Sequence, residues 1–187
     1  MGDYQTLFKE GFYFANPQDF YSIAGMAIFV LILLIFLRKN WESLSLSLQR
    51  DWVLYAVLAA VSPLLILIGG FKIGSSAIPL PNLPGEMPVA LFIPLAAISW
   101  QLASGILGIG PAFVLGIISG IVLGGFHTHS YFTILEFAGM ALLFAYFVRQ
   151  KFRSPFYHVL RIPLIAAIIT VLLFFPILTI TQFLNIG

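Results

Sequence analysis

The sequence predicts an all-α fold, a polytopic bundle of about six transmembrane helices forming one integral-membrane domain over residues 1–187. Charged residues make up 9% of the chain and hydrophobic residues 60%, whereas a soluble domain carries roughly 25% charged residues. The apolar runs are continuous and long enough to cross a hydrocarbon core of roughly 30 Å as helices. A membrane-spanning barrel would instead show short segments of alternating polarity.

Six apolar runs supply the predicted spans, and their approximate bounds are residues 21–37, 52–70, 89–107, 111–126, 133–148 and 163–184. The link GIGP joins the third run to the fourth and is too short for a free loop, so these two helices are expected to form an antiparallel hairpin. Residues 1–19 lack the basic region and small-residue cleavage site of a signal peptide. Their aromatic side chains predict an interfacial segment instead.

Basic residues predict the orientation of the bundle. Seven of the nine Lys and Arg residues fall in the links after the first and fifth runs: Arg38, Lys39, Arg50, Arg149, Lys151, Arg153 and Arg161. The positive-inside rule places both links in the cytoplasm, so both ends of the chain face outward across a bacterial-type inner membrane. Lipid is the expected surrounding. Split over two links, these charges form no stripe for a phosphate backbone, and no nucleic-acid partner is predicted.

Small residues recur every four positions in the fourth run, at Gly108, Ala112, Gly116, Gly120 and Gly124. This spacing puts them on one helical face, where small side chains let membrane helices approach closely. The pattern predicts a closely packed, central helix. Two interpretations remain: packing inside the bundle, or a seam for a second copy or a partner membrane protein.

The stretch FHTHSYFTILEF (residues 126–137) places His127, His129 and Glu136 between two apolar runs. In one interpretation Thr133 and Glu136 form a helix-capping box, and the histidines belong to an external turn. In the other, Glu136 lies inside the bundle, where an ionisable side chain costs roughly 2.5 kcal/mol or more and usually marks a site. There it could bind a cation, a proton or a polar ligand group.

Other polar residues give weaker signals. Trp100 and Gln101 lie in the middle of the third run, where Gln101 needs a hydrogen-bond partner from another helix or a ligand. Two histidines and one glutamate lack a fourth metal ligand, so no metal site is predicted, and the cofactor is unknown. The chain has no cysteine, and no hydrolase triad, metalloprotease motif or phosphate loop occurs, so nothing in the sequence supports an enzyme.

From Trp52 onward, an Ala-rich helix (Ala56, Ala59, Ala60), a loop containing PLPNLPG and the run GIGPAFVLGIISGIVLGG follow in order. This order resembles the S components of energy-coupling-factor vitamin transporters and related integral-membrane input modules of bacterial sensors. The resemblance implies a small ligand bound from the outer side beneath residues 71–88. It also implies that Ala56 and Ala60 contact a coupling partner.

Three functions are therefore considered. The first is a ligand-binding or sensor module whose outward-facing site beneath residues 71–88 is lined by Glu136, His127, His129, Gln101 and Trp100. The second is an accessory subunit that docks into a larger membrane complex through the glycine face of the fourth run. The third is a small membrane transporter.

Overall fold

The computed structural model describes residues 11–14, 20–39, 48–68, 71–73, 90–93, 95–150 and 155–186. Helices dominate these residues. The elements are, in chain order, α1 (Phe20–Lys39), α2 (Leu48–Ile68), β1 (Phe71–Ile73), β2 (Ala90–Phe92), α3 (Ile98–Ile106), α4 (Ile109–Leu123), a π-helical segment (Gly124–Thr128), α5 (Tyr131–Arg149), α6 (Pro155–Leu160) and α7 (Pro163–Ile186).

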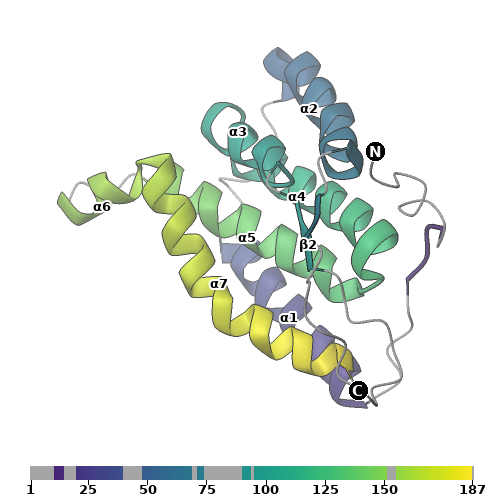
Figure 1. Cartoon of the computed structure of the whole chain (residues 1–187). Coiled ribbons are helices and arrows are strands. Elements are labelled where there is room, and N and C mark those ends of the chain that lie inside the picture. The colour runs from purple at the N-terminus through teal and green to yellow at the C-terminus, as the bar shows by residue number, and fades with distance from the viewer. Residues whose placement is uncertain are drawn as a thin grey trace.

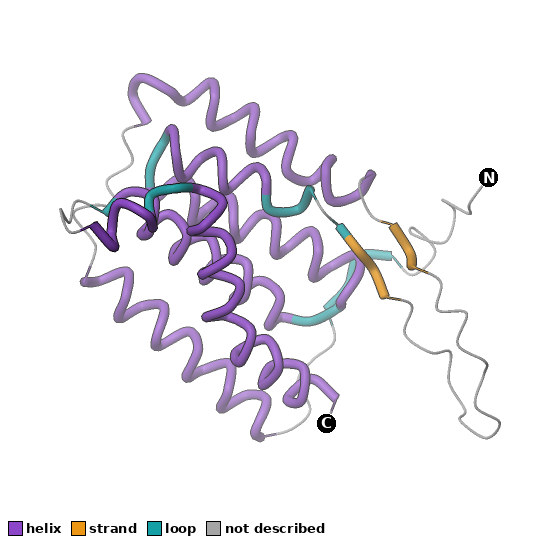
Figure 2. The backbone as a smooth tube through the Cα atoms, turned by 60° about the vertical axis from the view of Figure 1, so that its left-hand side comes forward, coloured by secondary structure: helices purple, strands orange, loops and turns teal. Residues whose placement is uncertain are grey.

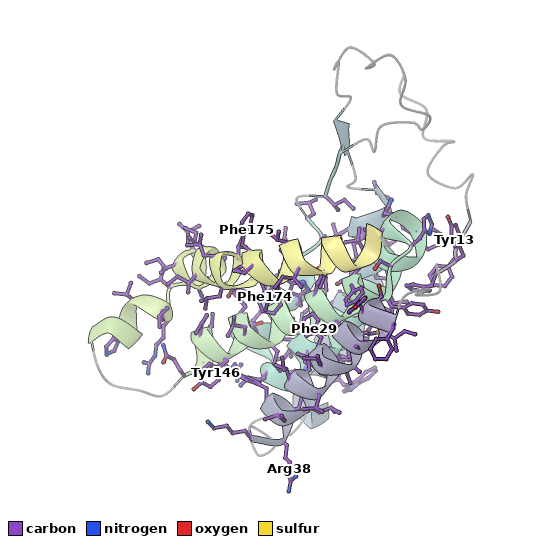
Figure 3. The ribbon with its side chains drawn as sticks, turned by 90° about the horizontal axis from the view of Figure 1, so that it is seen from below. Tyr13, Phe29, Arg38, Tyr146, Phe174 and Phe175 are labelled. Carbon is purple, nitrogen blue, oxygen red and sulfur yellow. The ribbon has the colours of Figure 1, made fainter. Side chains whose placement is uncertain are left out.

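Five of the described helices are long and apolar enough to cross a membrane, which is the pattern of a multi-pass membrane protein. They are α1, α2, α4 with its π-helical extension, α5 and α7. Large apolar side chains cover the outer faces of α1, α2 and α7. On α7, Phe174 points into the bundle and is 6% exposed, whereas its neighbour Phe175 points outward and is 66% exposed (Figure 3). Such outer faces suit lipid as the surrounding solvent.

The bundle is built around α4 and α5. Figure 1 shows these two helices at its centre, with α2 and α3 on one side and α7 and α1 on the other. More than half of the α4 span is buried, compared with about a fifth of the spans of α1, α2 and α7. Phe29 of α1 packs on Phe174 of α7 with ring centroids 6.5 Å apart. The outer helices therefore shield a central pair, as the small-residue pattern predicts.

The glycine row of α4 explains this closeness. A Cβ atom on Gly116 would lie 2.7 Å from the Cβ of Ala141, and one on Gly120 would lie 2.7 Å from the Cα of Ile134. Ala112 is fully buried. Only glycine lets these backbones meet at such distances. The face predicted as either packing surface or dock is thus occupied by α5 of the same chain.

The third predicted span differs most from the structure. A helix was expected over residues 89–107, but of the residues described in that range, 98–106 form a helix and 90–92 form β2 instead. The two strands pair antiparallel, with Phe71 opposite Phe92 (Figure 2). Proline at position 94 supplies the reason, because it disfavours helical geometry at Ile93. The resulting α3 has nine residues and is about 14 Å long, roughly half of a hydrocarbon core.

Two sets of hydrogen bonds join helices in this part of the bundle. The guanidinium of Arg149, at the end of α5, donates to the carbonyl oxygens of Ser104 (2.8 Å) and Gly105 (3.1 Å), at the end of α3. A cation suits the partial negative charge of a helix C-terminus. Between α2 and α4, the buried hydroxyls of Ser62 and Ser119 lie 2.7 Å apart in hydrogen-bond contact. The ends of α3 and α5 therefore lie at the same end of the bundle.

Candidate functional site

Glu136 is not part of a helix cap. The helix α5 begins one turn earlier than the sequence predicts, and Ser130 is its N-cap, with extended backbone angles and a side chain that accepts from the N–H of Phe132 at 3.2 Å. Thr133, the predicted cap, is buried inside the helix, and its hydroxyl lies 2.6 Å from that of Thr128. The capping-box interpretation is wrong, because Ser130 already satisfies the helix end.

Glu136 instead faces α7. Its carboxylate accepts a hydrogen bond from the hydroxyl of Thr181, a residue that is 4% exposed. The same hydroxyl lies 3.0 Å from the carbonyl oxygen of Leu178. A threonine hydroxyl has one hydrogen to donate, so it cannot fully satisfy both acceptors. The Glu136–Thr181 pair consequently retains capacity to receive a further donor.

The two predicted histidines lie at the junction of α4 and α5. His127 lies half-buried on the π-helical segment, and His129 has left-handed backbone angles (φ 52°, ψ 21°) that turn the chain toward α5. The imidazole of His129 stacks on the ring of Tyr13 at 3.8 Å and 8°, and its Nδ1 atom lies 3.2 Å from the carbonyl oxygen of Tyr13. A carbonyl only accepts, so Nδ1 carries the hydrogen in this contact.

The segment of residues 12–14, hereafter the aromatic segment, packs on that junction. The ring of Phe12 fills the space above Gly125, and a Cβ atom on Gly124 would lie 2.8 Å from the ring of Phe14. The N–H of Tyr13 donates to the carbonyl oxygen of Gly125 at 3.2 Å. The sequence predicted an interfacial aromatic stretch, but the adjacent glycines that receive it could not be paired with it from spacing alone.

Trp100 and Gln101 lie on α3, away from Glu136. Trp100 is 4% exposed and its ring meets that of Phe144 edge-on, with centroids 5.7 Å apart. Phe144 follows Glu136 by about two turns of α5, or roughly 12 Å along its axis. Gln101 is half-buried. The neighbouring Ser99, which sequence reasoning missed, is buried beside Trp100.

The predicted site residues therefore divide into three places: Glu136 with Thr181, His129 with the aromatic segment, and Trp100 with Ser99 at the start of α3. Among the residues that the structure describes, no three His, Asp or Glu side chains gather as metal ligands. The predicted covering loop, residues 71–88, begins with β1, and the remainder of it lies outside the described residues. Ala56 and Ala60 are exposed on α2.

Comparison of the sequence with protein-family models and curated proteins, and of the fold with solved structures, finds no match.

Proposed function

We propose that this protein is a membrane-embedded module that binds a small ligand, with Glu136 as its main recognition group. The supporting observation is the position of that carboxylate, which lies between α5 and α7 against Thr181 instead of capping a helix. An ionisable side chain within a membrane-spanning helix is expensive, so it is retained mainly where it serves a site.

The chemistry of the pair indicates what such a ligand offers. A carboxylate accepts hydrogen bonds and attracts positive charge, and the Thr181 hydroxyl has a single hydrogen shared between two acceptors. The group that Glu136 recognises is therefore a cation or a strong donor, such as an alkali ion or a protonated amine. A proton is the smallest member of this class, since a protonated Glu136 could itself donate to Thr181.

A thermal-shift experiment tests this proposal. The purified protein in maltoside detergent is titrated with sodium, potassium, methylammonium and ethanolammonium chlorides at constant ionic strength. We expect at least one cation to raise the midpoint of thermal unfolding. Glu136→Gln, which keeps the size of the side chain but removes its charge, should abolish the rise, and Thr181→Val should weaken it.

Asp51→Asn provides the matched control, because it removes a carboxylate from the start of α2, a different helix from the one that carries Glu136. It should leave the cation response unchanged. A response that survives Glu136→Gln, or that disappears equally in Asp51→Asn, would contradict a recognition role for Glu136.

We further propose that the basic ends of α1 and α5 face the cytoplasm of a bacterial-type cell and the aromatic segment faces outward. Figure 3 supports the separation, with Arg38 at the far end of α1 from Tyr13. Because the chain has no cysteine, single cysteines report their side directly. Thr128→Cys should react with an impermeant maleimide in intact cells, and His158→Cys only after permeabilisation; the reverse pattern would invert the assignment.

The transporter alternative has one observation in its favour. Ala56 and Ala60 lie exposed on α2, where a partner helix could approach them closely. Co-purification of a partner that is lost on replacing Ala60 by Leu, with the cation response intact, would favour it.

A further inference from the structure

We infer that the first turn of α3 is a binding subsite for the carboxylate group of a small ligand. The inference rests on the proposed ligand-binding function, but it uses residues other than Glu136 and can fail independently.

The N-terminus of α3 lies deep in the bundle, away from its basic end. Arg149 binds the carbonyl oxygens at its C-terminal end, which lies at the basic end of the bundle. Nine residues reach only about 14 Å from there, so the N-terminus of α3 stops near the middle of a 30 Å hydrocarbon core. Non-helical backbone at that depth is tolerated only where protein buries it or where it lines a polar cavity.

The N-terminus of α3 also lacks a side-chain cap. Ala97 occupies the N-cap position and offers no side-chain hydrogen bond. Two backbone bonds lie at this end: the N–H of Ala96 donates to the carbonyl oxygen of Ile93, and the N–H of Ile98, the first helical residue, donates to that of Leu95. The remaining N–H groups of the first turn lie at the partial positive charge of a helix N-terminus, and this favours an anionic partner.

Two buried side chains in the same turn supply an independent observation. Ser99 is 1% exposed and Trp100 is 4% exposed, yet within the described part of the chain neither the Ser99 Oγ nor the Trp100 Nε1 atom has a hydrogen-bond partner. A buried polar group without a partner lowers stability, so native structures usually satisfy it. Cα–Cβ bonds tilt toward the start of a helix, so the bonds that carry both side chains are directed toward this end of α3.

The chemistry of these groups selects the ligand class. The indole N–H can only donate, a serine hydroxyl can donate, and the helix end offers further N–H groups. A complementary group must present several acceptor lone pairs at one point and gains from negative charge. A carboxylate meets both demands, and half-helix N-termini at mid-membrane hold ligand carboxylates in known transporters.

Fluorescence and Raman spectroscopy can test the subsite directly. Replacing Trp41 and Trp52 by Phe leaves Trp100 as the sole indole of the three in the chain. The protein in maltoside is titrated with propionate and benzoate, and in parallel with propionamide and benzamide, against sodium chloride of equal ionic strength. We expect the carboxylates to shift the emission of Trp100 and the Raman band that reports hydrogen bonding at its indole N–H.

Variants of the full-length chain then assign the donors. Thermal-shift titrations should show that Ser99→Ala and Trp100→Phe each weaken carboxylate binding about tenfold, the size expected for one hydrogen bond to a charged group. Trp100→Phe keeps an aromatic ring against Phe144, so loss of the N–H dominates. Ser104→Ala is the matched control, because Ser104 lies in the last turn of α3 and its hydroxyl is already bonded to the backbone carbonyl oxygen of Trp100; this variant should bind normally.

Four results would overturn the subsite. In the first, no probe changes the indole N–H signal, as a permanently buried water would cause; in the second, the amides bind as tightly as the acids. In the third, Ser99→Ala binds carboxylates as well as Ser104→Ala does. In the fourth, the wild-type protein responds only to cations. The last result would leave the Glu136 proposal standing. Conversely, a carboxylate response that persists in Glu136→Gln, with no cation response in the wild type, would support the subsite while the Glu136 proposal failed.

Discussion

The contact between α4 and α5 gives a quantitative prediction for Gly120→Ala. The added Cβ atom would lie 2.7 Å from the Cα of Ile134 and 3.0 Å from the carbonyl oxygen of Thr133, whereas ordinary contact begins at 3.4 Å. Both neighbours are backbone atoms, so no side-chain rotation relieves the clash and the helices must separate by roughly 0.7 Å. Overpacking of this kind costs about 1–3 kcal/mol.

Gly105→Ala is the control for this prediction. A Cβ atom on Gly105 meets nothing within 4 Å, and the position is helical. Alanine should therefore be neutral there, or stabilise by up to about 1 kcal/mol through its helix propensity. Unfolding of both variants in mixed micelles, titrated with sodium dodecyl sulfate and followed by circular dichroism, measures the difference. If Gly120→Ala proved as stable as Gly105→Ala, the close approach of α4 and α5 would be refuted.

Two further outcomes follow from the packing. Ser62→Ala should lower the free energy of unfolding by about 1–3 kcal/mol because it leaves the Ser119 hydroxyl buried and unpaired. Replacing both serines should cost clearly less than the sum of the two single replacements. Simple additivity in the same unfolding assay would contradict the hydrogen bond between them. Gly125→Ala should displace the ring of Phe12 and speed chymotrypsin cleavage at that residue in nanodiscs, whereas an unchanged rate relative to Gly105→Ala would show that the aromatic segment does not pack there.

Hydrophobicity predicted most of the helices because lipid leaves the backbone few alternatives. The predicted first span, residues 21–37, falls within α1, and the predicted sixth, residues 163–184, falls within α7. The third span shows where this reasoning stops. Its composition is also strongly apolar, but Pro94 disfavours helical geometry at the preceding residue, and composition alone does not report that local constraint.

The candidate site was harder to predict. Ser130 and Thr133 are both suitable residues to cap the start of α5. The structure uses Ser130, and with the helix starting there Phe132 is buried (4% exposed). The spacing of residues along the sequence does not predict which side chains other helices will bury. Local sequence patterns also do not predict the partner of Glu136, because Thr181 lies 45 residues further along the chain. The residue types were therefore predictable, whereas their groupings depend on how the helices pack.

The tether between Arg149 and α3 has a consequence for how the protein is made. The arginine follows Ser104 by 45 positions, so it leaves the ribosome well after α3 has been synthesised. A stretch of nine helical residues is too short for the insertion machinery to hold as an independent anchor. In nascent chains that end before Arg149, the carbonyl oxygens at the C-terminus of α3 should therefore lack their cationic partner, and α3 should reach its final stability only when α5 is complete.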